Sequence, residues 1–184
     1  MRLSAAPLSA LPASVARPRY ERDTRGVGIV HFGIGAFHRA HMAVYVDDLL
    51  ARDPNWGIIG ASLRRPDSRD ALAPQDFLYI VAIRDAAGTS TRIIGSILDI
   101  LDANSQRDEL IAMLADPRIR IVSLTVTEGG YFINPATGRF DPEHPAMVQD
   151  GANPDNPVTT FGLILAGLKL RRDRQRQPAE RVKP

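Results

Sequence analysis

A short apolar run, Ile29–Phe32, leads directly into the glycine turn Gly33–Gly35 (GIG), and an amphipathic segment follows over residues 38–50. This order of strand, glycine turn and helix is typical of folds that present backbone N–H groups to the pyrophosphate of a dinucleotide. Gly33 permits the tight turn, and Gly35 leaves no Cβ between the backbone and the phosphates. The helix N-terminus then supplies free N–H donors and a partial positive charge.

The glycine motif is incomplete, because His38 stands where the third glycine of G-x-G-x-x-G belongs. That glycine normally allows the helix to pack closely on the strand. Ala40 and Ala43 are small enough to serve this packing instead. The spacing alone therefore leaves two interpretations open, a phosphate-binding turn and an ordinary connection between a strand and a helix.

Strand patterns and helix patterns alternate along the rest of the chain. The predicted strands are 27–32, 56–63 and 119–126, the predicted helices are 38–52, 67–73, 104–115 and 158–172, and 77–84 pairs with 89–97 in an antiparallel hairpin. Strands separated by helices imply right-handed crossovers. We therefore predict an α/β, Rossmann-like fold, with a mostly parallel sheet, helices on both faces and the hairpin as an insertion.

Composition excludes several classes of function. The chain has no cysteine, so it has no disulfide, thiolate metal site or cysteine nucleophile, and we expect a reducing, cytoplasmic location. No apolar run is long enough to span a membrane, and the Ala/Pro/Ser-rich start lacks the apolar core of an export signal. Residues 169–184 carry a net charge of +5 within a total of +2, so the body is slightly acidic. We expect neither a nucleic-acid nor a membrane partner.

Several separate blocks resemble one family. They are FGIGAFHRAHMAVYVDDLL from Phe32, WGI from Trp56, QDFLY from Gln75 and IVSLTVTEGGY from Ile121. Together they resemble the polyol-specific long-chain dehydrogenases, which include mannitol 2-dehydrogenase and fructuronate reductase. The resemblance covers residues 25–173, and within it a histidine at position 38 is typical of the family.

The resemblance implies an N-terminal Rossmann-type domain that binds NAD(H) or NADP(H), followed by a mainly helical domain. That second domain supplies the catalytic lysine with asparagine and histidine partners, and no metal takes part. The implied reaction is hydride transfer between the nicotinamide and a polyol, ketose or hexuronate. We expect residues 1–24 to form a flexible arm, 25–172 the NAD(P)-binding domain and 173–184 a disordered basic tail, with the catalytic domain absent.

No catalytic residue is assigned, because the family's SCDN segment does not follow the helix at 158–172. Lys169 and Lys183 are the only lysines, and neither lies in a matching motif. We therefore expect cofactor binding without turnover, since hydride transfer needs a proton acceptor on the alcohol. A sugar alcohol or keto-sugar is expected as a partner only when a C-terminal domain is supplied. The alternatives are a non-catalytic domain that associates with itself through its exposed domain interface, and one half of a split dehydrogenase.

The cofactor-binding candidates follow the ends of the first, second and last predicted strands. They are Gly33, Gly35, Ala36, Phe37, His38, Arg39, Asp67, Thr125 and Thr127. Phe37 offers a backbone N–H, and Arg39 is either a phosphate donor or a surface arginine. Thr125 and Thr127 are expected to line the nicotinamide half, since ligands bind beyond the carboxyl ends of such strands, and the alternative is a plain loop.

The choice of cofactor depends on the end of the second strand. Asp67 is placed to bond the ribose hydroxyls, which favours NAD, whereas Arg64 and Arg65 before it favour NADP. We favour NAD and keep NADP as possible. The H-x-x-H at His38 and His41 lacks a third ligand, so no metal site is predicted, and Asp47 and Asp48 are expected to face solvent or to pair along the helix.

Overall fold

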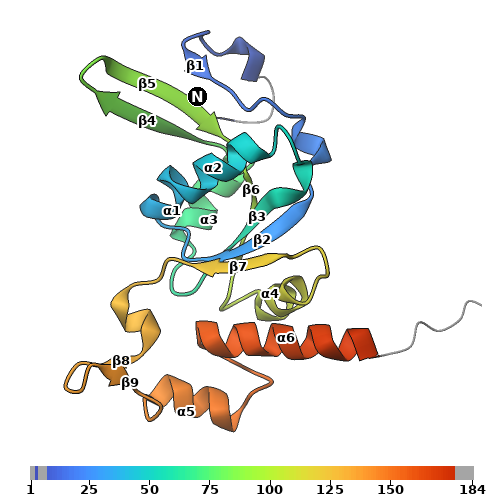
Figure 1. The fold of residues 1–184 in the computed structure, drawn as a ribbon, viewed down its shortest axis with the longest axis vertical. Helices are drawn as coiled ribbons and strands as arrows, with labels where there is room; N and C mark the ends of the chain where they lie inside the picture. The colour runs from blue at the N-terminus through green and yellow to red at the C-terminus, as the bar shows by residue number, and fades with distance from the viewer. Residues whose placement is uncertain (1–2, 4–7, 177–184) are drawn as a thin grey trace, which may run out of the picture.

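A parallel sheet of four strands forms the centre of the molecule (Figure 1). The computed structural model describes residue 3 and residues 8–176. The strands are β2 (Val27–Phe32), β3 (Gly57–Ser62), β6 (Ile97–Asp102) and β7 (Ile121–Leu124), in the order β6-β3-β2-β7. The chain thus builds outward from β2 in one direction and then returns to its other side, as in doubly wound folds.

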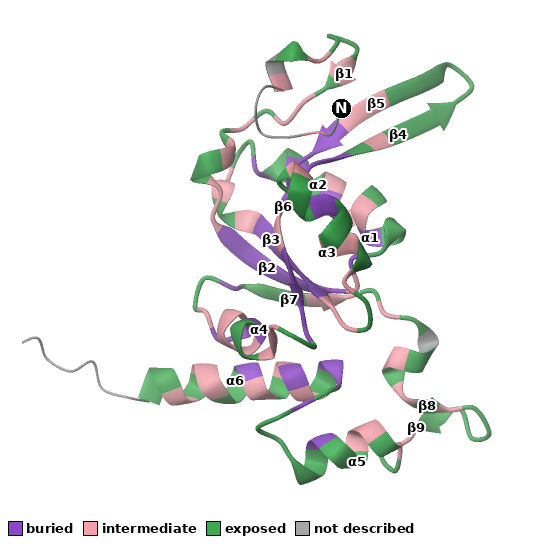
Figure 2. Cartoon of the chain, turned by 180° about the vertical axis from the view of Figure 1, so that it is seen from behind, coloured by how far each residue is buried: buried purple, intermediate pink, exposed green. Residues whose placement is uncertain are grey.

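Helices cover both faces of this sheet, which confirms the predicted fold class. On one face lie α1 (Ala36–Ala40), α2 (Met42–Leu49) and α3 (Asp67–Leu72), and on the other lie α4 (Arg107–Leu114) and α6 (Thr160–Arg176) (Figure 1). Neighbouring residues of β2 serve opposite faces. Ile29 packs among side chains of α2 and α3, whereas Val30 packs among those of α4 and α6. Figure 2 shows β2 and β3 buried along their length.

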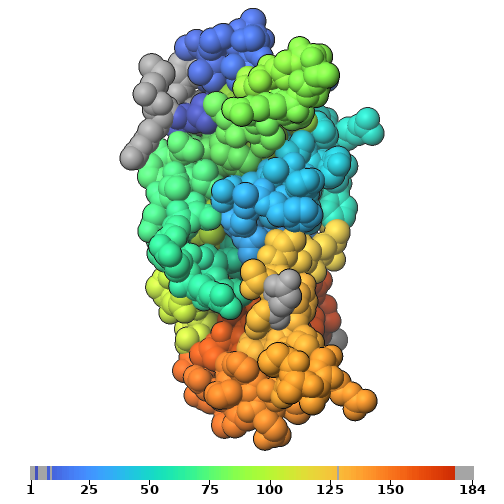
Figure 3. Space-filling view, turned by 90° about the vertical axis from the view of Figure 1, so that its left-hand side faces the viewer, coloured from blue at the N-terminus to red at the C-terminus, as the bar shows by residue number. Residues whose placement is uncertain are grey.

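A second, smaller sheet carries the predicted hairpin, β4 (Tyr79–Asp85) and β5 (Gly88–Ile94). The N-terminal segment adds β1 (Val15–Ala16) in parallel to β5. The arm predicted to be flexible therefore lies against the hairpin over this stretch, as the space-filling view shows (Figure 3). The Tyr20 hydroxyl also donates a hydrogen bond to Asp47 and holds the arm to α2.

Three sequence-based boundaries are wrong, each for a local reason. The helix predicted over 38–52 breaks at His41, whose backbone angles (φ −124°, ψ −87°) are not helical, so α1 and α2 are separate. The strand predicted over 89–97 ends at Ile94, and a separate strand, Ile97–Asp102, begins after Gly95-Ser96. Residues 173–176, predicted to be disordered, continue α6; the rest of the predicted tail, 177–184, lies outside the described residues.

The segment between β7 and α6 leaves the end of β7 and runs to the far side of α6 from the sheet (Figure 1). It contains the short pair β8 (Ile133–Asn134) and β9 (Arg139–Phe140) and the helix α5 (Pro145–Ala152), which was not predicted. Ile121 and Val122 on β7 remain partly exposed, because β7 pairs only with β2 among the described strands. Self-association through such a face stays a prediction. In the described residues no helix is long and apolar enough to cross a membrane.

Candidate functional site

The glycine turn follows β2 directly and has the conformation that only glycine adopts readily. Gly33 has φ +93°, and a Cβ at this position would collide with the carbonyl oxygen of Thr125. The Gly33 N–H donates to the carbonyl of Ala61 at the end of β3 at 3.0 Å. The turn is therefore held between the ends of β3 and β7, and a side chain at position 33 is incompatible with it.

Gly35, unlike Gly33, has open space beside its backbone. A Cβ added there would meet no atom within 4 Å, so the backbone at this position borders open space. Gly35 is the N-cap of α1, and its own N–H donates to the carbonyl of Gly33 at 2.8 Å. The following first-turn N–H groups have no partner within the helix. The space beside Gly35 is thus free for a group that accepts hydrogen bonds.

That open space belongs to a cavity of about 310 Å³. It lies at the carboxyl ends of β2, β3 and β7, where the strand order reverses, which is where open α/β sheets bind ligands. Its lining residues are Gly33, Ile34, Gly35, Ser62, Leu63, Arg64, Arg65, Thr125, Val126, Thr127 and Gly130. Of the nine candidates, the structure brings four together here, namely Gly33, Gly35, Thr125 and Thr127.

A buried histidine ties the two strands together below the cavity. His31 on β2 is 1% exposed, and its Nδ1 and Nε2 lie 2.8 Å from Ser123 Oγ and 2.9 Å from Thr125 Oγ1. The Thr125 hydroxyl donates to the carbonyl of Gly33 at 2.9 Å. Because that proton is committed, His31 Nε2 must be the donor to Thr125, which assigns the neutral Nε2–H tautomer. The network fixes the glycine turn relative to β7.

His38 stacks on His31 instead of leaving room for a third glycine. The two ring centroids are 3.7 Å apart, with 21° between the ring planes. His38 is fully buried, and neither of its ring nitrogens has a hydrogen-bond partner among the described residues. Burial lowers the pKa of His31 to about 4, and burial with the neighbouring His31 and Arg39 lowers the pKa of His38 to about 3. Both rings are therefore neutral at physiological pH.

The remaining first-helix candidates do not line the cavity. Arg39 turns into the fold, where its Nη1 donates to the carbonyl of Ile34 at 3.0 Å and to Ser68 Oγ at 3.1 Å. The Phe37 ring is 67% exposed and stacks on His41 at 4.4 Å. Ala36 opens α1 beside the cavity rim. For Ala36 and Phe37 the candidate group for phosphate binding is therefore the backbone N–H and not the side chain.

The residues expected from the sequence to select between NAD and NADP follow the end of β3. Arg64 and Arg65 line the cavity, whereas Asp67, the first residue of α3, does not. Arg65 Nη2 lies 3.0 Å from Asp67 Oδ2, and both side chains are largely exposed. Such an exposed ion pair is weak and easily exchanged for a ligand contact. Asp67, which favours NAD, and Arg65, which favours NADP, are therefore in contact with each other in the structure.

Sequence reasoning missed the part of the lining that comes from Ser62, Leu63, Val126 and Gly130. Ser62 donates to the carbonyl of Arg65 and shapes the loop after β3. The predicted order of the strands points to the residues after the second strand, because a parallel strand next to the first one ends beside the glycine turn.

The histidine and lysine candidates for other chemistry are engaged elsewhere. His41 Nδ1 lies 2.8 Å from the carbonyl oxygen of Phe37. Within the described ranges no three His, Cys, Asp or Glu side chains form a metal-binding group. Lys169 on α6 lies 3.4 Å from Asp155 and does not line the cavity at the glycine turn. Lys183 lies outside the described residues.

Comparison with known proteins gives a consistent result. A family model described as the mannitol dehydrogenase Rossmann domain matches residues 27–182. A mannitol 2-dehydrogenase of Cereibacter sphaeroides is 51% identical over 164 residues, which are 87% of this chain and 34% of that protein. A polyol:NADP oxidoreductase of Gluconobacter oxydans is 43% identical over 171 residues, 90% of this chain and 35% of that protein.

Two solved structures are similar over nearly the whole chain. A Pseudomonas fluorescens mannitol 2-dehydrogenase in a ternary complex with NAD and D-mannitol has a TM-score of 0.89 and 43% identity, covering 95% of this chain and 37% of that one. A substrate-free D-sorbitol dehydrogenase has a TM-score of 0.88 and 40% identity, with the same coverage. The chain thus spans about a third of the length of the relatives it matches.

Proposed function

The chain belongs to the mannitol dehydrogenase family, and on that premise we propose that it is the dinucleotide-binding part of an oxidoreductase. The reaction of the whole enzyme is hydride transfer between a nicotinamide cofactor and a polyol or the corresponding ketose. Its relatives are named for mannitol and other polyols, and the solved relative holds NAD and D-mannitol. A hexuronate stays the alternative substrate.

The observation that carries this proposal is the open space beside Gly35. A Cβ added at Gly35 would meet no atom within 4 Å, and the glycine borders a cavity at the point where the strand order reverses, next to free N–H groups of α1. A pyrophosphate fits this arrangement, because it accepts hydrogen bonds from backbone N–H groups and approaches closest where no Cβ intervenes.

The residues around the cavity have separate roles in the proposal. Gly33 and Gly35 shape the turn, and the N–H groups of Ala36 and Phe37 donate to the phosphates. Thr125 and Thr127, after β7, border the nicotinamide half of the site. The bound nicotinamide supplies or accepts the hydride. His31 holds Thr125 and the glycine turn in register, so that both halves of the cofactor meet a preformed surface.

We propose that residues 1–184 by themselves bind the cofactor without turnover. Hydride transfer from an alcohol needs a base within hydrogen-bond reach of its proton. Among the described side chains that line the cavity there is no histidine, lysine or carboxylate that could serve. Robust oxidation of mannitol, or reduction of fructuronate, by the purified chain would contradict this part of the proposal.

Replacing Gly35 with alanine tests the site directly. We expect the Kd for NADH, measured by fluorescence titration, to rise about tenfold or more, because the new Cβ keeps phosphate from charge-assisted bonds to the backbone. The free energy of unfolding is expected to change by about 1 kcal/mol at most, since φ is −83° and no atom is displaced.

Gly151→Ala is the matched control. Gly151 also has no neighbour within 4 Å of an added Cβ, but it lies in α5, away from the cavity. NADH affinity is expected to be unchanged in this variant. Unchanged NADH binding by a folded Gly35→Ala protein would place the cofactor elsewhere.

We propose NAD as the preferred cofactor, with NADP as the alternative. Asp67 favours NAD once its exposed ion pair with Arg65 opens, because a carboxylate accepts the ribose hydroxyls and repels a 2′-phosphate. Parallel titrations are expected to give a lower Kd for NADH than for NADPH. Asp67→Ala is expected to reduce the difference between these two Kd values. Tighter NADPH binding that weakens on Arg65→Ala would reverse this preference.

A further inference from the structure

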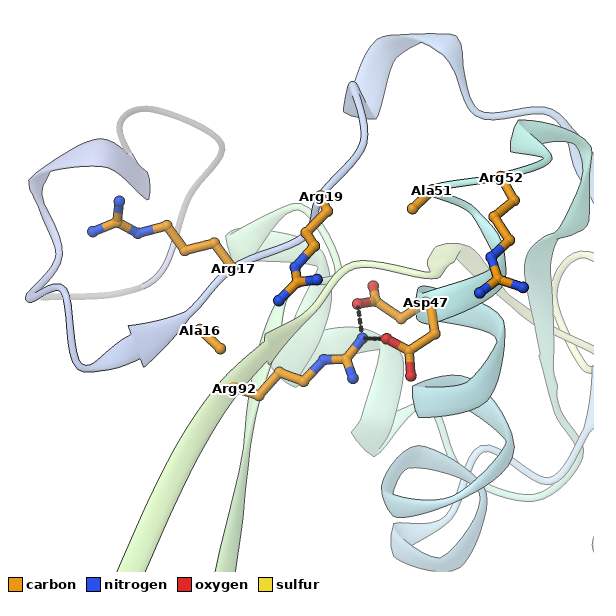
Figure 4. A pocket seen from close by; sticks show the side chains of 8 residues that line it. Ala16, Arg17, Arg19, Asp47, Ala51, Arg52 and Arg92 are labelled. Atoms are coloured by element: carbon orange, nitrogen blue, oxygen red, sulfur yellow. Dashed lines mark hydrogen bonds and ion pairs between the residues drawn. The ribbon is translucent and has the colours of Figure 1, made fainter.

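A second cavity, of about 460 Å³, shares no lining residue with the one at the glycine turn. It forms where three segments meet: the N-terminal arm, the C-terminal end of α2, and β5 of the hairpin (Figure 4). Its lining residues are Ala16, Arg17, Arg19, Asp47, Asp48, Ala51, Arg52 and Arg92.

One part of the cavity wall is already paired. Arg92 Nη2 lies 2.8 Å from Asp47 Oδ2 and 2.6 Å from Asp48 Oδ1. Asp47 is buried, and its carboxylate also accepts from the Tyr20 hydroxyl and from the N–H of Gly95. The hydrogen-bonding capacity of Asp47 is therefore used within the protein.

The other charged groups have capacity to spare. Arg19 and Arg52 are exposed, and their side chains make no hydrogen bond or ion pair with any residue that the structure describes. Figure 4 shows Arg19 reaching in from the arm and Arg52 from the end of α2, on two sides of the carboxylates, while Arg17 turns away. Arg17 instead donates to the carbonyl of Leu11. The unused donors in the cavity thus come from two guanidinium groups of different segments.

We propose that this cavity binds a small phosphate ester that carries hydroxyl groups. Guanidinium groups match the oxygens of a phosphate in geometry, and a bound phosphate would stabilise the Arg19 and Arg52 side chains, which make no ion pair with a described residue. Asp48 Oδ2 has no partner among the described residues, and a carboxylate oxygen there accepts from a hydroxyl. The volume is in the range of small-molecule sites, about 300–1,000 Å³. The proposal does not depend on the dinucleotide site.

Titration with glycerol 3-phosphate, followed by backbone amide shifts in ¹H–¹⁵N NMR, tests the proposal. We expect saturable shifts at Ala16, Arg19, Ala51 and Arg52. In the double variant Arg19→Ala/Arg52→Ala the Kd is expected to rise about tenfold or more, as for the loss of charge-assisted hydrogen bonds. Shifts confined to the glycine turn would overturn the proposal while supporting a phosphate site there.

The matched control is Arg84→Ala/Arg139→Ala, which removes the same charge from two exposed arginines on β4 and β9. It is expected to change the Kd by less than about twofold, because remote surface charges are screened. An equal loss of affinity for glycerol 3-phosphate in the two double variants would show that the ligand is attracted by surface charge in general, and would overturn the proposed site. Asp48→Ala removes the proposed acceptor and is expected to weaken binding of glycerol 3-phosphate but not of inorganic phosphate. Identical behaviour of the two probes would overturn the hydroxyl half of the assignment.

Discussion

Lowering the pH from about 7 to about 4.5 is expected to remove about 5 kcal/mol of folding stability through His31 and His38 alone. Their folded pKa values, about 4 and about 3, lie below the ordinary value of 6.5, chiefly because both rings are buried. The unfolded chain therefore binds protons from pH 6.5 downward while the folded protein does not. The contribution of the two histidines to folding stability is fully present above pH 6.5. It is lost as the pH falls toward their pKa values in the folded protein.

This loss is large in comparison with a typical domain stability of about 5–15 kcal/mol. Urea unfolding at a series of pH values measures it. Asp102 and Asp116, whose pKa values are lowered by hydrogen bonds from Ser105 and Arg118, contribute below about pH 4 and so outside this window.

His38→Phe isolates one of the two rings. A phenyl ring keeps a flat, apolar partner for His31 and removes a titrating group that has no hydrogen-bond partner to lose. About half of the pH-dependent loss is expected to disappear. A variant with the same pH profile as the parent protein would show that the buried histidines do not govern acid unfolding.

The glycine turn could be predicted from sequence because its cause is local. Gly33 and Gly35 follow an apolar strand directly, and the conformations that they adopt are those that glycine alone favours. The alternation of strands and helices likewise fixed the fold class. The strand Ile97–Asp102 is hard to predict because Asp99 and Asp102 interrupt the apolar pattern, although the strand pairs with β3 and most of its residues are buried.

The rest of the site depends on contacts between segments distant in sequence. His31 bonds Ser123 and Thr125, which are more than 90 residues away, and its stacking on His38 follows from the helix angle. Nothing in the local pattern distinguishes these rings from ordinary core histidines. The cavity at the glycine turn therefore needed the sheet order before its lining could be assigned.

Asp47 is the clearest case of a misjudged residue. We expected Asp47 and Asp48 to face solvent or to pair along the helix, and Asp48 is indeed 64% exposed at its side chain. The Asp47 side chain is 1% exposed, because the arm and the hairpin close over it. Its three donors come from Tyr20, Arg92 and Gly95, so one carboxylate joins the arm, the hairpin and α2.

Replacing Asp47 with alanine is expected to lower the free energy of unfolding by about 3–5 kcal/mol, the cost of breaking a buried charge pair from one side. The change leaves the partly buried Tyr20 hydroxyl and the buried Gly95 N–H without their acceptor. Urea unfolding, with Tyr fluorescence to follow the arm, measures the loss.

Asp48→Ala is a closely matched control, since it removes the same charge and a bond to the same Arg92 from the next residue. Because Asp48 is largely exposed, this change is expected to cost at most about 1 kcal/mol. A large difference between two adjacent aspartates can arise only if burial decides the cost. Similar small losses in both variants would mean that water reaches Asp47, and that the arm does not close over α2 as the structure places it.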